Sequence, residues 1–67
     1  MTTQSYTVTG MTCAHCVASV TEEVSAIAGV TTVDVDLASG ALTITADQPV
    51  ADDAVRAAVD EAGYALA

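Results

Sequence analysis

The sequence predicts an α+β fold in which two helices cover one face of an antiparallel four-stranded sheet. Three observations predict it: two stretches with apolar residues at helical spacing, short stretches in which polar and apolar residues alternate, and the order in which these stretches follow one another. The chain has 67 residues, so we expect one domain, residues 1–67, with a thin core.

The first half of the chain shows both periodicities. Residues 5–9 alternate between polar and apolar and predict a strand that ends at Gly10. We expect residues 10–15 to form a loop. Residues 16–28 place Val, Ile and Ala at helical spacing and predict a helix, which Gly29 ends in the left-handed conformation.

The second half completes the pattern. The expected elements are, in order, a strand at 32–37, a hairpin loop at 38–40, a strand at 42–45, a helix at 54–62 that stops at Gly63, and a short closing strand within 64–67. The order is therefore βαββαβ, which is the ferredoxin-like arrangement.

This topology brings three connections to one end of the molecule. A strand–helix–strand crossover makes the first two strands run in the same direction. Residues 10–15, 38–40 and 63–64 should then lie at the same end of the sheet. We expect the loop that carries both cysteines to be a neighbour of Tyr64.

The charge balance excludes two classes of partner. The chain has nine Asp and Glu residues against a single Arg, for a net charge of −8. Nucleic acids and anionic membrane surfaces would both repel it. The acidity favours either plain solubility or a docking field for a basic partner.

The composition also bears on location and activity. The chain begins without a basic, apolar leader and has no apolar stretch long enough to span or insert into a membrane, so we expect a cytoplasmic location with reduced thiols. A core of small aliphatic residues leaves little room for an enclosed substrate cavity, and we expect no enzyme.

The chemistry of the chain centres on Cys13 and Cys16. The C-x-x-C spacing, on a loop that opens a helix, lets both sulfurs converge on one point, and the helix amino terminus favours thiolates. Two soft thiolates without another fixed ligand suit Cu(I). A structural zinc site and an iron–sulfur cluster each require four ligands, which the chain does not offer.

The main alternative is a small dithiol–disulfide oxidoreductase, because C-x-x-C after a strand also serves that chemistry. Thioredoxin-like folds are longer and place a cis-proline opposite the motif. The only proline here, Pro49, precedes the second predicted helix.

Residues 10–16, which read Gly-Met-Thr-Cys-Ala-His-Cys, resemble the G-M-x-C-x-x-C signature of the heavy-metal-associated domain family. Residues 55–64 resemble the family's second helix and Gly-Tyr corner, so the likeness extends from Tyr6 to Tyr64. A free-standing domain of this length resembles the bacterial copper chaperones of the CopZ type, and the initiating Met1 favours a complete protein. An excised amino-terminal domain of a copper-transporting ATPase is the alternative.

The resemblance implies a function and a set of site residues. It implies Cu(I) bound by Cys13 and Cys16 and passed to the amino-terminal metal-binding domain of a copper-exporting P-type ATPase, with a cytosolic copper-sensing repressor as a further partner. It also implies that Met11 packs beneath the loop and that Tyr64 lies near the metal. Thr12 stands where zinc- and cadmium-handling relatives often have an acidic residue, which favours copper.

Three neighbouring residues have competing interpretations. His15 should point away from the direction that the sulfurs share, so it acts either as a group that tunes the thiolates or as an exposed spacer. Met11 is core packing rather than a thioether ligand. Tyr64 can be a core aromatic and a neighbour of the site at once. With two exposed thiolates, we expect a monomer without metal and a copper-bridged homodimer when loaded.

Overall fold

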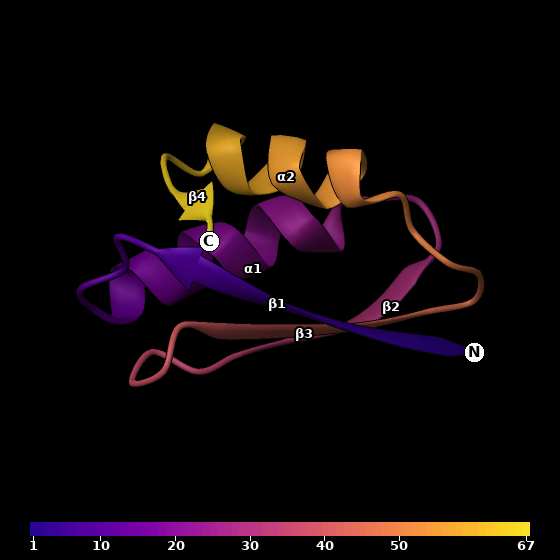
Figure 1. Ribbon diagram of the computed structural model, residues 1–67, viewed down its shortest axis with the longest axis horizontal. Coiled ribbons are helices and arrows are strands. Elements are labelled where there is room, and N and C mark those ends of the chain that lie inside the picture. Colours follow the sequence, from indigo (N-terminus) through magenta and orange to yellow (C-terminus); the bar gives the residue numbers. More distant parts are fainter.

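The computed structural model describes all residues, 1–67, and has the predicted βαββαβ order (Figure 1). The elements are β1 (Thr2–Thr9), α1 (Ala14–Ser25), β2 (Val30–Val35), β3 (Ala41–Ala46), α2 (Asp52–Glu61) and β4 (Ala65–Leu66). Both helices lie on one face of a four-stranded sheet, which confirms the predicted fold class. Neither helix is long and apolar enough to cross a bilayer.

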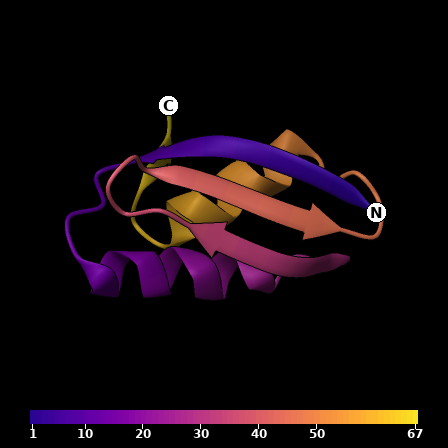
Figure 2. The same ribbon diagram turned by 90° about the horizontal axis from the view of Figure 1, so that it is seen from below.

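The sheet has the strand order β2-β3-β1-β4, and every neighbouring pair is antiparallel (Figure 2). β3 is central: it pairs with β1 over Thr2–Thr7 and with β2 over Val30–Val35. Because β1 and β2 both run antiparallel to β3, they run parallel to each other, as the crossover predicts.

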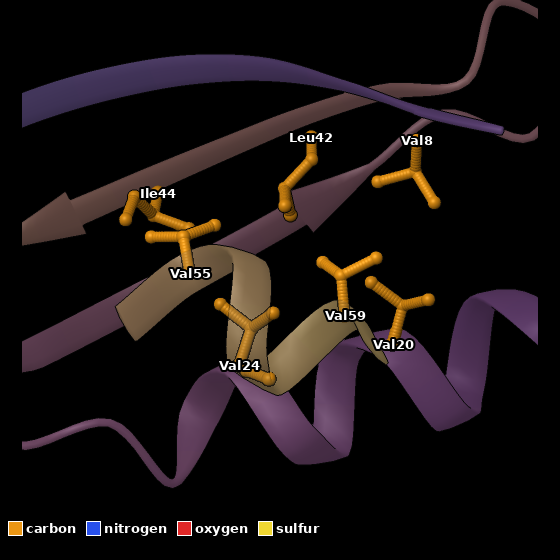
Figure 3. Packing of buried hydrophobic residues seen from close by; sticks show 8 residues of the cluster. Val8, Val20, Val24, Leu42, Ile44, Val55 and Val59 are labelled. Atoms are coloured by element: carbon orange, nitrogen blue, oxygen red, sulfur yellow. The ribbon is translucent and has the colours of Figure 1, made fainter. Parts of the chain in front are cut away.

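The core lies between the sheet and the helices (Figure 3). Leu42 and Ile44 of β3 are fully buried. They face valines from both helices, and the fully buried valines are Val20 and Val24 of α1 and Val55 and Val59 of α2. The opposite face of the sheet is polar, so apolar burial on one side holds the layers together.

Several element boundaries differ from the predicted ones. β1 begins at Thr2, because the polar residues before Ser5 still pair with β3 through their backbones. β2 ends at Val35, and Leu37 lies exposed in a hairpin loop that starts at residue 36. α2 begins at Asp52, where two acidic residues in the first turn suit the helix dipole.

The first helix differs at both ends. It starts at Ala14, two residues before the predicted start, because the Cys13 carbonyl already accepts hydrogen bonds from the amides of Cys16 and Val17. It stops at Ser25 with the right-handed Ala26 as its cap. The prediction that Gly29 ends this helix is wrong: Gly29 has positive φ, but it forms the turn into β2.

The three connections do gather at one end of the molecule (Figure 1). The amide of Val8, at the end of β1, donates to the carbonyl of Gly40 in the hairpin loop at 2.8 Å. A Cβ placed on Gly10 would lie 3.4 Å from Cδ1 of Tyr64, so the cysteine loop and the Gly-Tyr corner are in contact.

We predict that Gly40→Ala destabilises the fold far more than Gly29→Ala. Both glycines have positive φ, which costs an alanine about 1–2 kcal/mol. At Gly40 the new Cβ would also lie 2.6 Å from the Val8 carbonyl oxygen, whereas nothing lies within 4 Å at Gly29. We expect a loss of about 3 kcal/mol at Gly40 and about 1 kcal/mol at Gly29 in urea unfolding of the metal-free protein. Equal losses would contradict the close approach.

Candidate functional site

The two cysteines flank the first residues of α1. Cys13 has extended backbone angles (φ −155°, ψ 174°) and occupies the N-cap position, but its side chain makes no capping hydrogen bond. The thiol of Cys13 is therefore free to face outward. Cys16 lies in the first turn of the helix, as the sequence predicts, close to the positive end of the helix dipole.

The two sulfur atoms lie 3.7 Å apart. Both cysteines are free thiols, and they differ in access: Cys13 is exposed, whereas Cys16 is only 8% exposed. One sulfur therefore reaches solvent while the other is held against the protein. The pair can present two thiolates to a single ion at the surface.

Two hydroxyl groups and the loop backbone surround the Cys16 sulfur. The Thr12 hydroxyl oxygen lies 3.8 Å from it. The pKa of Cys16 falls from 9.0 to about 6, mainly because of hydrogen bonding from the Thr12 backbone, then from the Tyr64 hydroxyl and the Cys13 backbone, while desolvation opposes the fall. The pKa of Tyr64 rises in return, chiefly through its hydrogen bond with Cys16. Cys16 is therefore a thiolate at neutral pH.

The end of α2 places Tyr64 at this sulfur. Gly63, with φ +93°, donates its amide to the Asp60 carbonyl at 2.9 Å, and Tyr64 donates its amide to the Val59 carbonyl at 3.1 Å. These two bonds define a Schellman motif, which requires a residue that tolerates positive φ at its turn. The motif redirects the chain toward β1, and Tyr64 contacts the cysteine loop as a consequence.

The other predicted site residues lie around the pair in different ways. Met11 is half-buried and packs against the core cluster. His15 is exposed, and it is not among the groups that shift the pKa of Cys16. No third His, Cys, Asp or Glu side chain is grouped with the two cysteines in a cluster that could hold a metal.

The sequence singles out Thr12 because it is uncharged where zinc- and cadmium-handling relatives often have an acidic residue, but it does not predict the contact of Thr12 with Cys16. Thr12 and Cys16 are four residues apart at the start of a helix, and this spacing could have indicated that their side chains are neighbours. The approach of Tyr64 to Gly10 confirms the prediction that the cysteine loop and the Gly-Tyr corner are neighbours.

Comparisons with known proteins identify the family of this chain. The sequence model of the heavy-metal-associated domain family matches residues 5–65, so the chain belongs to that family. Among its relatives, the COP-associated protein of Helicobacter felis is 36% identical over 59 residues, which cover 88% of this chain and 89% of that protein.

Two solved structures extend the comparison. A CopZ metallochaperone superposes with a TM-score of 0.91 at 31% identity, covering 98% of this chain and all of that one. A copper binding domain from HMA7, a P-type ATPase, superposes with a TM-score of 0.90 at 28% identity, covering all of this chain and 92% of that one. The fold is thus similar to that of a metallochaperone and to that of an ATPase domain.

We predict that Tyr64→Phe raises the pKa of Cys16, because it removes a hydroxyl that stabilises the thiolate. The ultraviolet absorbance of the thiolate, followed against pH in the metal-free protein, should show a midpoint near 6 in the parent. In Tyr64→Phe that midpoint should move toward 9.0. Cys16→Ser should remove this transition altogether.

His15→Ala separates the two interpretations of the histidine in the same titration. Because His15 is not among the groups that shift the pKa of Cys16, we expect the midpoint to stay where it is. A displaced midpoint in His15→Ala would support the tuning role that the sequence suggested and would contradict the assignment to Thr12, Tyr64 and Cys13.

Proposed function

We propose that this protein is a cytoplasmic Cu(I) carrier, formed by a single heavy-metal-associated domain over residues 1–67, and not an enzyme. Cys13 and Cys16 hold one ion between their thiolates. The observation that carries the proposal is the pair of free sulfur atoms 3.7 Å apart at the surface, one of them on a thiol whose pKa lies below neutrality.

The ligand set favours Cu(I) over other metals. Two thiolates suit a soft ion of low coordination number. Zinc prefers four ligands, and no third His, Cys, Asp or Glu joins the pair. Thr12 lies 3.8 Å from the Cys16 sulfur, so an uncharged hydroxyl occupies a place where an acidic residue would supply a hard oxygen ligand.

The difference in exposure between the two cysteines allows the ion to be transferred to a partner protein. The exposed Cys13 leaves the bound ion open to an incoming thiolate of a partner, which adds to the metal and forms a three-coordinate species. The two thiolates of this chain then dissociate one after the other, the second as another partner thiolate binds, and the ion passes to the partner without ever being free in solution. Cys16 can leave as a thiolate at neutral pH, so its release requires no proton.

The partner we propose is the amino-terminal metal-binding domain of a copper-exporting P-type ATPase. The similarity to a copper binding domain from a P-type ATPase supports it, because two domains of the same fold can present equivalent cysteine loops to each other. A cytosolic copper-sensing repressor is a second partner to which the same exchange would apply.

We predict that the metal-free protein takes up one Cu(I) per chain, and that Cys13→Ser and Cys16→Ser each lose it to a competing chelator. Each substitution removes one of two soft ligands. Anaerobic titration against a colorimetric Cu(I) chelator measures the affinity. Met11→Leu is the matched control: it keeps the core volume and removes the only nearby thioether, and we expect parental affinity.

Two results, one from that titration and one from a disulfide reduction assay, would contradict the proposal. A cysteine variant that held copper as the parent does would show that the ligands lie elsewhere. Catalytic reduction of protein disulfides by the parent, without stoichiometric copper uptake, would assign the C-x-x-C pair to dithiol–disulfide exchange instead.

We also predict that copper drives self-association. The sulfur pair leaves Cu(I) coordinatively unsaturated, and Gly10, Thr12 and Ala14, which flank it, are exposed and uncharged, so a second chain can approach and supply sulfur ligands. Repulsion between two chains of net charge −8 opposes this, but salt screens it beyond roughly 8 Å. Anaerobic sedimentation should find monomers without metal and dimers with Cu(I). A loaded monomer at high salt would disprove the copper bridge.

A further inference from the structure

One edge of the sheet is formed by a strand from the middle of the chain. β2 pairs with β3 on one side, and no strand of the structure pairs with its other side. The strands β1 and β4, which lie nearest the two ends of the chain in sequence, are on the far side of β3 (Figure 2). The free side of β2 is therefore a property of residues well inside the sequence.

The hairpin shows which backbone groups of β2 are free. The amide of Asp36 donates to the Ala41 carbonyl and the carbonyl of Asp36 accepts from the Gly40 amide, both at 2.8 Å, so the backbone of Asp36 points toward β3. In an antiparallel pair both backbone groups of a residue point to the same edge, and successive residues alternate. The N–H and C=O groups of Val33 and Val35 therefore point away from β3, where no strand pairs with them.

The regular part of this edge is short. A register shift between Val30 and Thr32 interrupts the pairing of β2 with β3, and the Thr31 hydroxyl donates to the Thr45 carbonyl at 3.0 Å there. Such an irregularity bends a strand and limits what can pair with its edge. From Thr32 to Val35 the pairing is regular, and this stretch contains no Pro or Lys that would block a further strand. The edge thus has room for a short segment.

The two faces of β2 differ in chemistry. Val33 and Val35 are half-buried and pack against the core cluster, on the face that the helices cover. Asp34, between them, is exposed on the opposite face. α1 contacts β2 and runs alongside it (Figure 2). A strand added at this edge would place alternate side chains next to the two valines and the others next to Asp34, so it should alternate between apolar and polar residues.

The charge on this side of the molecule indicates which polar residues fit. Residues 14–46, which include α1, β2 and β3, contain no Lys or Arg. Their acidic residues are Glu22, Glu23, Asp34 and Asp36. The single cation of the chain, Arg56, lies on α2 beside residues of β1 and β4. A second copy of β2 would bring Asp34 close to acidic residues of its own kind, which is destabilising, whereas a basic segment complements them.

We propose that the free edge of β2 binds a short, extended segment of a partner protein in which basic and apolar residues alternate. Hydrogen bonds to the backbones of Val33 and Val35 supply the affinity. A Lys or Arg side chain next to Asp34, and apolar side chains next to the two valines, supply the selectivity. None of these residues belongs to the cysteine loop, so binding of the segment does not require a metal at the sulfur pair.

The first test adds a synthetic peptide of alternating Lys and Val, acetylated and amidated, to the ¹⁵N-labelled metal-free protein. We expect chemical shift changes centred on residues 32–36 and slower amide hydrogen exchange at Val33 and Val35. The same peptide, N-methylated at the residues that face β2, cannot donate to the carbonyls of the edge and should not bind. No shift changes, shift changes centred on another element, or equal binding of the N-methylated peptide would each overturn the proposal.

Two variants and a second peptide separate the local contact from the net charge. Asp34→Asn removes the charge next to the bound segment, and we expect about threefold weaker binding of the Lys–Val peptide. Asp53→Asn, in the first turn of α2, changes the net charge by the same amount and should bind as the parent does. Equal weakening in both variants would show that net charge alone attracts the peptide and would overturn the site at β2. A Glu–Val peptide that bound as tightly as the Lys–Val peptide would overturn the assignment of a basic partner.

Discussion

The structure depends on the burial of β3 beneath two helices. Leu42 and Ile44 reach no solvent, and each faces valines contributed by both helices. A chain of this size has one small core and no second cluster to compensate for its loss. The site has no independent support, since the helix that carries Cys16 and the helix that positions Tyr64 are both fixed by this packing. Removal of a buried methyl group far from the sulfurs would therefore change the geometry of the site, because it would shift the helices that position Cys16 and Tyr64.

The site itself is made from helix ends rather than from a cavity. The start of α1 supplies a sulfur with backbone donors, and the end of α2 supplies a hydroxyl through a tight turn. Both contributions depend on backbone hydrogen bonds that the helices leave unsatisfied at their ends. This is how a small aliphatic protein without enclosed space can lower the pKa of a thiol to about 6.

Much of this could be predicted from the sequence, for a physical reason in each case. Alternation and helical spacing show which side chains are buried, and they therefore predict the order of the strands and helices. That order, together with the handedness of the crossover, predicts that Tyr64 lies near the cysteine loop. Boundaries were less predictable. The polar residues Thr2–Gln4 carry no alternation signal, yet their backbones pair with β3. Gly29 does not end the first helix, although its type is compatible with that role, because glycine permits positive φ in a turn and in a cap alike.

The groups that lower the pKa of Cys16 could not be predicted from the sequence. His15, adjacent to Cys16 in the chain, was the obvious candidate to tune it. The groups that lower the pKa of Cys16 include the backbone of Thr12 and the side chain of Tyr64, which is 48 residues away, because hydrogen bonding depends on direction as well as on proximity. The orientation of an N–H group or a hydroxyl depends on the geometry of the turns, and the hydrophobic periodicity of the sequence does not predict that geometry.

The distribution of aromatic rings has a spectroscopic consequence. The chain has no Trp or Phe, so all aromatic emission comes from Tyr6 and Tyr64. Tyr6 is hydrogen-bonded to Gln4 and Asp52, whereas the pKa of Tyr64 is raised chiefly by Cys16, so the two chromophores report separate regions. A chain with Tyr6→Phe would have a single intrinsic fluorophore, placed by the fold at the sulfur pair, and ligand arrival there could be followed optically without an attached dye.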